Sequence, residues 1–287
     1  MHEKSTIRIV TDSAAQIPAA WAAENRVVVL PHKVMIDGKT YIDGVDLSND
    51  ALADRMQSPD AVIKVIPPSV DEFIAVYQML ADEKADVISL HVSSALSDTI
   101  KHATQAQAEF RGRCNIQIID SKCISLGLNG LVYAAKEFTE TNQSTDAIVK
   151  RVRGLLAHVY GLFVSANLEH LERSQRLRPA QAELGNMLGV IPCLSLEEGD
   201  IVAVEKVRSP ERAIERLTEF AGEFDDFVNL GVLQLGSQLH EQTQLLLESL
   251  QPAFPKLPAI PICQCGPIIG NIIGPAGFGV MIFEGEQ

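Results

Sequence analysis

A dense cluster of hydroxyl side chains follows one apolar run of the chain. Residues 86–92 (DVISLHV) are nearly all apolar, and Ser93, Ser94, Ser97 and Thr99 follow before a helical pattern begins. In a parallel α/β sheet, ligands bind outside the carboxyl ends of the strands, where a helix start offers free backbone N–H groups. The cluster therefore suits a small anion, a carboxylate or a phosphate. The alternative is that Ser94 or Ser97 simply caps the helix.

Two shorter segments also place polar side chains where apolar runs end. Thr11, Asp12 and Ser13 follow one run, and Asp120 and Ser121 follow another. If these runs are parallel strands, their carboxyl ends share a sheet edge with the hydroxyl cluster. Asp and Ser at such points most often cap helices and brace turns, and we expect that role here.

Patterns for catalysis and metal binding are weak. The sequence has no GxSxG nucleophile elbow, and its seven histidines show neither an HExxH motif nor paired ligand spacing. His91 precedes the serines, but adjacent strand residues point to opposite faces, which weakens a Ser–His catalytic pair. A serine hydrolase or transferase is thus the weakest hypothesis, and we expect no catalytic residue, metal or cofactor.

Two further segments have both a structural and a functional interpretation. Arg173, Arg176 and Arg178 form a basic cluster that is either a solvated helix end or a contact for a phosphate or a partner. Residues 266–279 (GPIIGNIIGPAGFG) interleave glycine and proline with isoleucine, which favours a packed turn between buried strands or a pocket wall. This segment lacks the lysine and the following helix of a phosphate-binding loop.

The spacing of apolar runs indicates the elements that must position these residues. In the first half, β-type runs alternate with helical patterns, which predicts βαβ units and a parallel sheet covered on both faces. These runs are residues 7–13, 27–36, 86–93 and 116–121. The second half has paired runs around a hairpin signal at Glu198-Gly199-Asp200 and further apolar strands. We therefore expect an α/β protein of two domains, residues 1–159 and 160–287.

Composition limits the class of protein. The chain has 287 residues, 46% of them hydrophobic and 21% charged, and its formal net charge is −13. It can form a core and it repels a phosphate backbone, so we expect neither nucleic acid nor an anionic membrane surface as a partner. Residues 257–283 carry no charge, but four prolines and five glycines interrupt them, which argues against a stable membrane span.

The N-terminal residues and the cysteines indicate the compartment. The first residues, MHEKSTIRIVTDS, lack the long apolar core of a signal peptide, and the five cysteines lack zinc-ligand spacing. We expect buried free thiols in a cytoplasmic protein.

Taken together, these segments resemble the DegV family, which includes the fatty-acid-binding subunits of bacterial fatty acid kinase. The resemblance covers residues 7–283. The matching pieces are TDS at 11–13, VVVLPHKVMIDGKTYIDGVDLS at 27–48, SSALS at 93–97, IIDSK at 118–122, LEHLERSQRL at 168–177 and GPIIGNIIGP at 266–275. The resemblance implies two α/β domains with a ligand tunnel between them. It also implies a carrier, not an enzyme, that holds a long-chain fatty acid while a partner kinase phosphorylates the carboxylate.

Several positions depart from the family's usual residues. Val65-Ile66-Pro67-Pro68 stands where members typically carry Thr-Ser-Gln-Pro, whose threonine contacts the carboxylate. Asp98 stands where glycine is usual, and Ser174-Gln175-Arg176 where Gly-Gly-Arg is usual. Ile272 replaces a histidine, and Gly274-Pro275-Ala276 replaces Gly-Pro-Gly. Two polar contacts have thus become apolar, so a carboxylate would find fewer donors.

The hydroxyl cluster and the resemblance together define the expected site. Ser93 and Ser94 are expected to donate hydrogen bonds to the head group, while Ser97 and Thr99 brace their loop. The other expected ligand-binding residues are Val65, Ile66, Asn271, Ile272 and Arg176. The leading hypothesis is a fatty acid carrier. The alternative is a diverged member that binds a different amphiphile and has no kinase partner.

Overall fold

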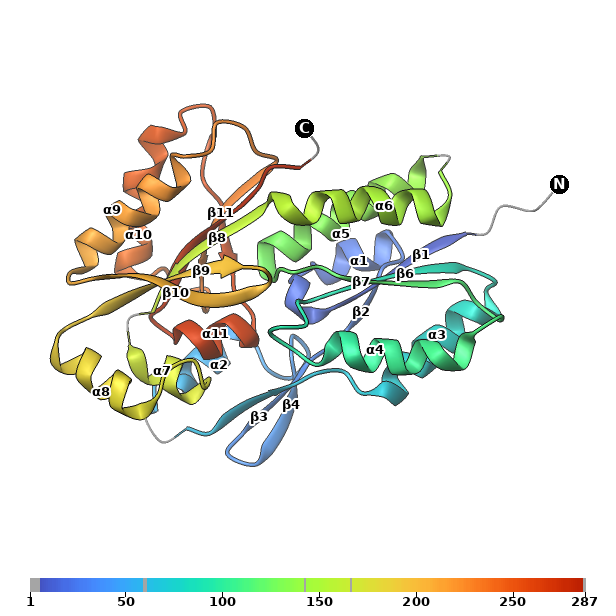
Figure 1. The fold of residues 1–287 in the computed structure, drawn as a ribbon, viewed down its shortest axis with the longest axis horizontal. Helices are drawn as coiled ribbons and strands as arrows, with labels where there is room; N and C mark the ends of the chain where they lie inside the picture. The colour runs from blue at the N-terminus through green and yellow to red at the C-terminus, as the bar shows by residue number, and fades with distance from the viewer. Residues whose placement is uncertain (1–5, 59–60, 142, 166, 286–287) are drawn as a thin grey trace.

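The computed structural model describes residues 6–58, 61–141, 143–165 and 167–285. The first half is built on a parallel sheet of order β2–β1–β6–β7, which confirms the expectation from alternating strands and helices. Its strands are β1 (Ile7–Asp12), β2 (Val28–Leu30), β6 (Asp86–His91) and β7 (Ile116–Asp120). Their carboxyl ends point toward the second half of the molecule (Figure 1).

Helices cover both faces of this sheet. On one face, α3 (Val70–Asp82) and α4 (Thr99–Gln107) bury a cluster that includes Val87. On the other, α1 (Ala19–Glu24), α5 (Ser125–Glu140) and α6 (Thr145–Leu155) pack over a cluster that includes Ile88. Successive residues of β6 therefore enter different cores, which is why this strand reads as one continuous apolar run.

A small antiparallel sheet of order β4–β3–β5 follows β2. It consists of β3 (Lys33–Ile36), β4 (Lys39–Ile42) and β5 (Ile63–Ile66), with α2 (Asn49–Met56) between the last two. Asp37 and Gly38 both have positive φ, 50° and 82°, as a two-residue hairpin turn requires. The hairpin returns the chain so that the Asp43 N–H donates to the His32 carbonyl at 3.0 Å.

The second half contains a six-stranded mixed sheet of order β10–β9–β8–β13–β11–β12. All its pairings are antiparallel except that of β11 with β12. The strands are β8 (Val159–Val164), β9 (Ile191–Glu197), β10 (Asp200–Val207), β11 (Asn229–Gln234), β12 (Ile262–Gln264) and β13 (Phe278–Phe283). Helices α9 (Pro210–Ala221) and α10 (Glu241–Leu250) cover one face, and the expected hairpin turn joins β9 to β10.

Helix α5 packs the two halves into one continuous core. A Cβ at Gly127 would lie 2.3 Å from Cγ1 of Val159 in β8, and one at Gly130 would lie 2.6 Å from Cδ1 of Phe283 in β13. The backbone of α5 thus approaches the second sheet more closely than any larger residue would allow. One hydrophobic cluster runs from Ile9 to Phe283 across this contact.

This close approach predicts opposite effects for two helical glycines. Gly127→Ala should destabilise the protein by about 1–3 kcal/mol, because the methyl group overpacks the contact with Val159. Gly154 in α6 has open space around its Cβ, so Gly154→Ala should stabilise by up to about 1 kcal/mol through helix propensity. Urea unfolding of both variants checks this, and stabilisation by both would contradict the packing argument.

The segment of isoleucines and glycines forms a helix, α11 (Pro267–Ile273), which corrects the expectation of a turn between strands. Pro267 occupies the first turn, where its missing N–H costs nothing, and Gly274 follows the last residue with φ of 82°. Isoleucine and glycine have low helix propensity, so their spacing in the sequence did not predict a helix. The burial of the isoleucines stabilises the helical conformation instead. In the described part of the chain, no helix is long and apolar enough to cross a membrane.

The cysteines largely follow the expectation of buried free thiols. Cys123, Cys193 and Cys265 are buried, whereas Cys114 and Cys263 are partly exposed. Burial raises the pKa of the Cys123 and Cys265 thiols to about 12, which keeps them protonated and unreactive.

Candidate functional site

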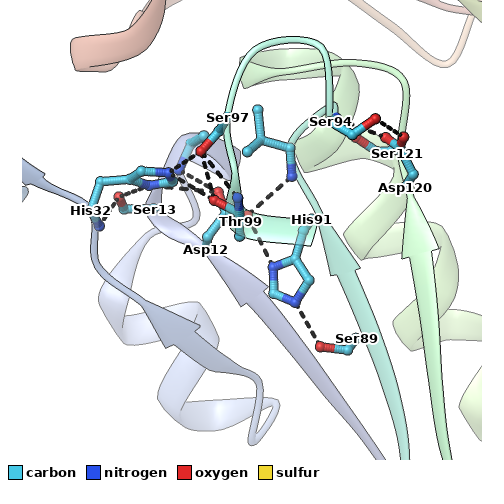
Figure 2. A network of polar contacts seen from close by, with 12 residues as sticks. Asp12, Ser13, His32, Ser89, His91, Ser94, Ser97, Thr99, Asp120 and Ser121 are labelled. Carbon is cyan, nitrogen blue, oxygen red and sulfur yellow. Dashed lines mark hydrogen bonds and ion pairs between the residues drawn. The ribbon is translucent and has the colours of Figure 1, made fainter. Parts of the chain in front are cut away.

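Asp12, the last residue of β1, is the buried centre of a polar network (Figure 2). Its Oδ1 accepts from the Ala14 N–H, and its Oδ2 accepts from the Val92 N–H and from His91 Nδ1, each at 3.0 Å. Burial pushes the pKa of Asp12 upward, but His91, His32 and the Val92 amide together hold it below its usual value. Asp12 therefore braces its turn as an enclosed anion.

From Asp12 a chain of hydrogen bonds runs into the first core. His91 Nε2 lies 2.6 Å from Ser89 Oγ, and Ser89 Oγ lies 2.7 Å from the hydroxyl of Tyr77 in α3. All four side chains are buried, so this Ser–His–Asp arrangement gives a substrate no access. Ser89 lies two residues before His91 on the same face of β6. The alternation of side chains along a strand therefore predicts that these two residues are neighbours.

A second branch of the network runs through His32 to the hydroxyl cluster (Figure 2). His32 Nδ1 lies 3.2 Å from Ser13 Oγ and 3.8 Å from Asp12 Oδ1, while Nε2 lies 3.2 Å from Thr99 Oγ1. Thr99 Oγ1 in turn lies 2.8 Å from Ser97 Oγ. Burial lowers the pKa of His32, Asp12 only partly opposing this, so the imidazole is neutral. No local motif around His32 marks it as part of this network.

A cavity of about 500 Å³ has Ser97 in its lining, and we call it the Ser97 cavity. It lies where β5 and the loop before α4 meet the end of α7 (Leu168–Arg173) and helix α11. Six expected site residues line it: Ser97, Val65, Ile66, Asn271, Ile272 and Arg176. Elements far apart in sequence thus meet here between the two halves, and the volume suits a small-molecule pocket.

The residues that line the Ser97 cavity carry more positive than negative charges, whereas the whole protein has a net negative charge. Lys64, Arg173 and Arg176 line it together with one acid, Asp98. Arg176 Nη1 donates to Asp200 Oδ1 at 2.7 Å and to the Ile201 carbonyl at 2.9 Å, which ties the cavity wall to β10. The Asp98 side chain is 65% exposed, so water screens its repulsion of an anion in the cavity.

The other serines of the cluster lie apart from this lining. Ser94 Oγ donates to Asp120 Oδ2 at 2.5 Å, and Ser93 is fully buried with its Oγ accepting from the Ala95 N–H at 3.2 Å. Ser93 also lies against Gly199 of the β9–β10 turn, where a Cβ would approach its Oγ to 2.4 Å. The hydroxyl groups of Ser93 and Ser94 therefore form hydrogen bonds within the protein, whereas Ser97 lines the cavity. Thr99 is buried and contacts Ser97. Contact of Ser93 and Ser94 with a head group stays a prediction.

A second cavity, of about 400 Å³, lies within the second half beside α7 and α8 (Pro179–Met187). Leu168, Leu171 and Leu177 form part of its largely apolar lining. No cluster of metal-binding side chains occurs among the residues that the structure describes. The architecture therefore offers one largely apolar cavity and one cavity of mixed polar and apolar lining, and Ser97 of the polar network belongs to the wall of the second.

Comparison with known proteins agrees with this architecture. Residues 6–285 match the model of the DegV family, described as a family of uncharacterised proteins. A DegV domain-containing protein of Staphylococcus aureus is 30% identical over 216 residues, which cover 75% of this chain and 76% of the relative. Another, from Streptomyces coelicolor, is 29% identical over 277 residues, 96% of this chain and 98% of the relative.

Solved structures show the same arrangement of elements. A structure titled as fatty acid binding by a DegV family protein of Thermus thermophilus has a TM-score of 0.83 at 28% identity, covering 97% of this chain and 99% of that one. A fatty acid binding DegV family protein of Streptococcus agalactiae has a TM-score of 0.87 at 26% identity, covering 99% and 100%. The family model spans nearly the whole chain, and this protein therefore belongs to the DegV family.

Proposed function

We propose that this protein is a carrier that binds a long-chain fatty acid in the Ser97 cavity. The observation that carries the proposal is that Ser97, which bears a hydroxyl, lines a cavity together with Val65 and Ile272. A carboxylate fits the hydroxyl end and an acyl chain fits the apolar walls. The relatives from Thermus thermophilus and Streptococcus agalactiae, described as fatty acid binding, support the same ligand class here.

The energetics favour a ligand held mainly by its tail. Each buried methylene contributes about 0.8 kcal/mol, so a long acyl chain outweighs the cost of ordering the ligand. Lys64 on the cavity wall favours an anionic head group over a neutral one, whereas Arg173 and Arg176 are already paired with Glu169 and Asp200. The head group therefore sets orientation and selectivity more than total affinity.

A partner kinase that phosphorylates the bound carboxylate is the finer part of the proposal. It rests on the resemblance to fatty acid kinase subunits, in which the binding protein presents the carboxylate and does not catalyse transfer. The direct test is incubation of the loaded protein with ATP and the kinase subunit from the same organism. An acyl phosphate trapped by hydroxylamine is the expected product, and its absence with an active kinase would contradict the partnership.

A second candidate ligand is a neutral or differently charged amphiphile, with no kinase partner. Val65, Ile66 and Ile272 line the same cavity as Ser97, so the hydroxyl has apolar neighbours where a carboxylate would need donors. Fewer donors penalise a carboxylate more than a neutral head group such as an alcohol.

Mass spectrometry of the organic extract of gently purified protein separates these candidates. A near-stoichiometric fatty acid is the result that the carrier proposal expects. A stoichiometric amphiphile of another class would favour the second candidate. An empty protein that also binds no fatty acid from a panel would contradict both.

Ser97→Ala should weaken fatty acid binding by roughly 10- to 100-fold, since a hydrogen bond to a charged group is lost from the cavity wall. The matched control is Ser94→Ala in the same loop, whose hydroxyl already donates to Asp120. Titration with hexadecanoate measures both. Equal losses in the two variants would contradict the assignment of the head group to Ser97.

Val65→Thr should tighten hexadecanoate binding by roughly three- to tenfold, because it adds a hydroxyl donor to the cavity at unchanged side-chain size. Hexadecanol, which carries no charge, should gain less. Val62→Thr is the control, since Val62 is 65% exposed just before β5. Unchanged carboxylate affinity in Val65→Thr would place the head group elsewhere.

A further inference from the structure

His102, one turn into α4, is a partly buried histidine in the lining of the Ser97 cavity. Its Nδ1 lies 2.8 Å from the carbonyl oxygen of Pro68, just before α3. A carbonyl oxygen only accepts hydrogen bonds, so Nδ1 carries a proton and donates it. This contact fixes the tautomer, and a neutral imidazole at this position has its lone pair on Nε2.

The second ring nitrogen of His102 is open to a ligand. Among the residues that the structure describes, Nε2 has no hydrogen-bond partner, and it is not one of the buried polar atoms that lack one. Water or a ligand therefore has access to it. Ser97 precedes α4 and His102 follows one turn into this helix, and both line the same cavity.

We propose that His102 is a specificity-determining residue whose Nε2 contacts the head group of the ligand, so that binding of a fatty acid carboxylate takes up a proton at His102. The inference rests on the proposed function and deepens it. It concerns how the Ser97 cavity distinguishes a carboxylate from a neutral head group, and it adds a second polar contact beside the Ser97 hydroxyl.

The fixed tautomer decides what Nε2 offers to each head group. A neutral His102 presents a lone pair there, which accepts from the hydroxyl of an alcohol but repels a carboxylate oxygen. A proton added from the solvent gives an imidazolium, which donates to the carboxylate through Nε2–H and still donates to the Pro68 carbonyl through Nδ1–H. The hydrogen bond to the carboxylate is charge-assisted and therefore stronger than one between neutral groups.

The charges around the cavity decide when His102 gains this proton. Lys64 of β5 disfavours a second cation while the cavity is empty. Asp98 favours one, but its side chain is exposed and lies 3.8 Å from Lys101 Nζ. A carboxylate in the cavity offsets the charge of Lys64 and stabilises the imidazolium. Of the other charged side chains that line the cavity or begin α3, Asp71 is exposed and the rest are paired, Arg173 with Glu169, Arg176 with Asp200 and Glu72 with Lys33.

The first test is the number of protons taken up when hexadecanoate binds at about pH 7.5, measured by titration calorimetry in two buffers of different ionisation enthalpy. Wild type should take up roughly half to one proton more than His102→Gln, because a glutamine amide gains no proton. Protons taken up by the fatty acid itself cancel in this difference. Equal uptake by the two proteins would overturn the inference.

The same linkage should appear in the affinity. From about pH 6 to pH 8, hexadecanoate binding by wild type should weaken by roughly three- to tenfold relative to His102→Gln, because the proton that binding requires becomes scarcer. His158→Gln is the matched control, since His158 pairs with Glu284 in the second half and is not part of the cavity lining. This control should keep the pH dependence of wild type.

The two possible failures are distinguishable. If wild type binds hexadecanoate and its affinity relative to His102→Gln is constant with pH, the inference is overturned and the proposed function stands. If wild type binds no fatty acid, the proposed function itself is overturned, and the inference with it.

Spectra of ¹⁵N-labelled histidine provide a readout that a purely structural role would not change. At about pH 7.5, His102 should be the neutral Nδ1–H tautomer in the empty protein and should have both ring nitrogens protonated with hexadecanoate bound. Hexadecanol, which carries no charge, should leave the neutral tautomer in place. A neutral His102 in the hexadecanoate complex, or an Nε2–H tautomer in the empty protein, would overturn the inference.

Discussion

Asp12→Ala is expected to lower the free energy of unfolding by about 3–5 kcal/mol, because it removes a buried carboxylate that accepts three hydrogen bonds. The carboxylate accepts from His91 Nδ1 and from the Val92 and Ala14 N–H groups, and all of these bonds are buried. Without the carboxylate, three donors stay in the interior with no partner, each at the cost of a lost hydrogen bond. Urea unfolding at pH 7 measures the effect.

Asp120→Ala is the matched control, since Asp120 also ends a strand of the same sheet. Asp120 accepts from the Ser94 N–H and hydroxyl and from the Lys122 N–H, but its side chain is 22% exposed and water can replace it. A loss of about 1 kcal/mol is therefore expected. If the free energy of unfolding fell by about 1 kcal/mol in both variants, Asp12 would not be the buried centre of the network.

The sequence predicted the elements better than the contacts between them. The parallel order of the first sheet follows from apolar runs separated by helices, and it places Asp12 and His91 at one edge. It does not tell which hydroxyl faces a cavity. Ser94 and Ser97 are three residues apart in one loop, yet Asp120 binds the first and the second borders the cavity. Only the packing of α11 and β5 decides this.

His32 could not be found from local patterns, because its neighbours come from distant segments. Thr99 is 67 residues away in sequence, and the contact exists only because the β3–β4 hairpin lies beside the loop after β6. Helix α11 was missed for a related reason: its isoleucines are poor helix formers, and their burial between the two halves outweighs propensity. Tertiary packing determines both features, and a single sequence does not record it.

The network at the strand ends therefore has two parts with different physical roles. The Asp12–His91–Ser89–Tyr77 chain is buried throughout and anchors the edge of the sheet. The Ser13–His32–Thr99–Ser97 chain ends at a residue of the cavity wall. Asp43 is held at a cost to stability, and that cost should be measurable as a dependence on pH.

Asp43→Asn should raise the free energy of unfolding by on the order of 2–3 kcal/mol at pH 8 and leave it nearly unchanged at pH 4. Burial raises the pKa of Asp43 from 3.8 to about 6 in the folded protein, the Ser13 hydrogen bond and the Asp12 charge making smaller contributions. Between these values the unfolded chain has released a proton that the folded protein still holds. Stability from Asp43 is therefore fully present below about pH 4 and is lost as the pH rises through 6.

Unfolding of wild type and variant between pH 4 and pH 8 gives the difference directly. Asp46→Asn is the control, because Asp46 is exposed in the same loop and its change should stay within about 0.5 kcal/mol at any pH. A variant at Asp43 that is less stable than wild type at pH 8 would mean that the ionised carboxylate is well solvated or paired. A gain that grows with pH would instead show that burial makes the ionised carboxylate of Asp43 costly to the folded protein.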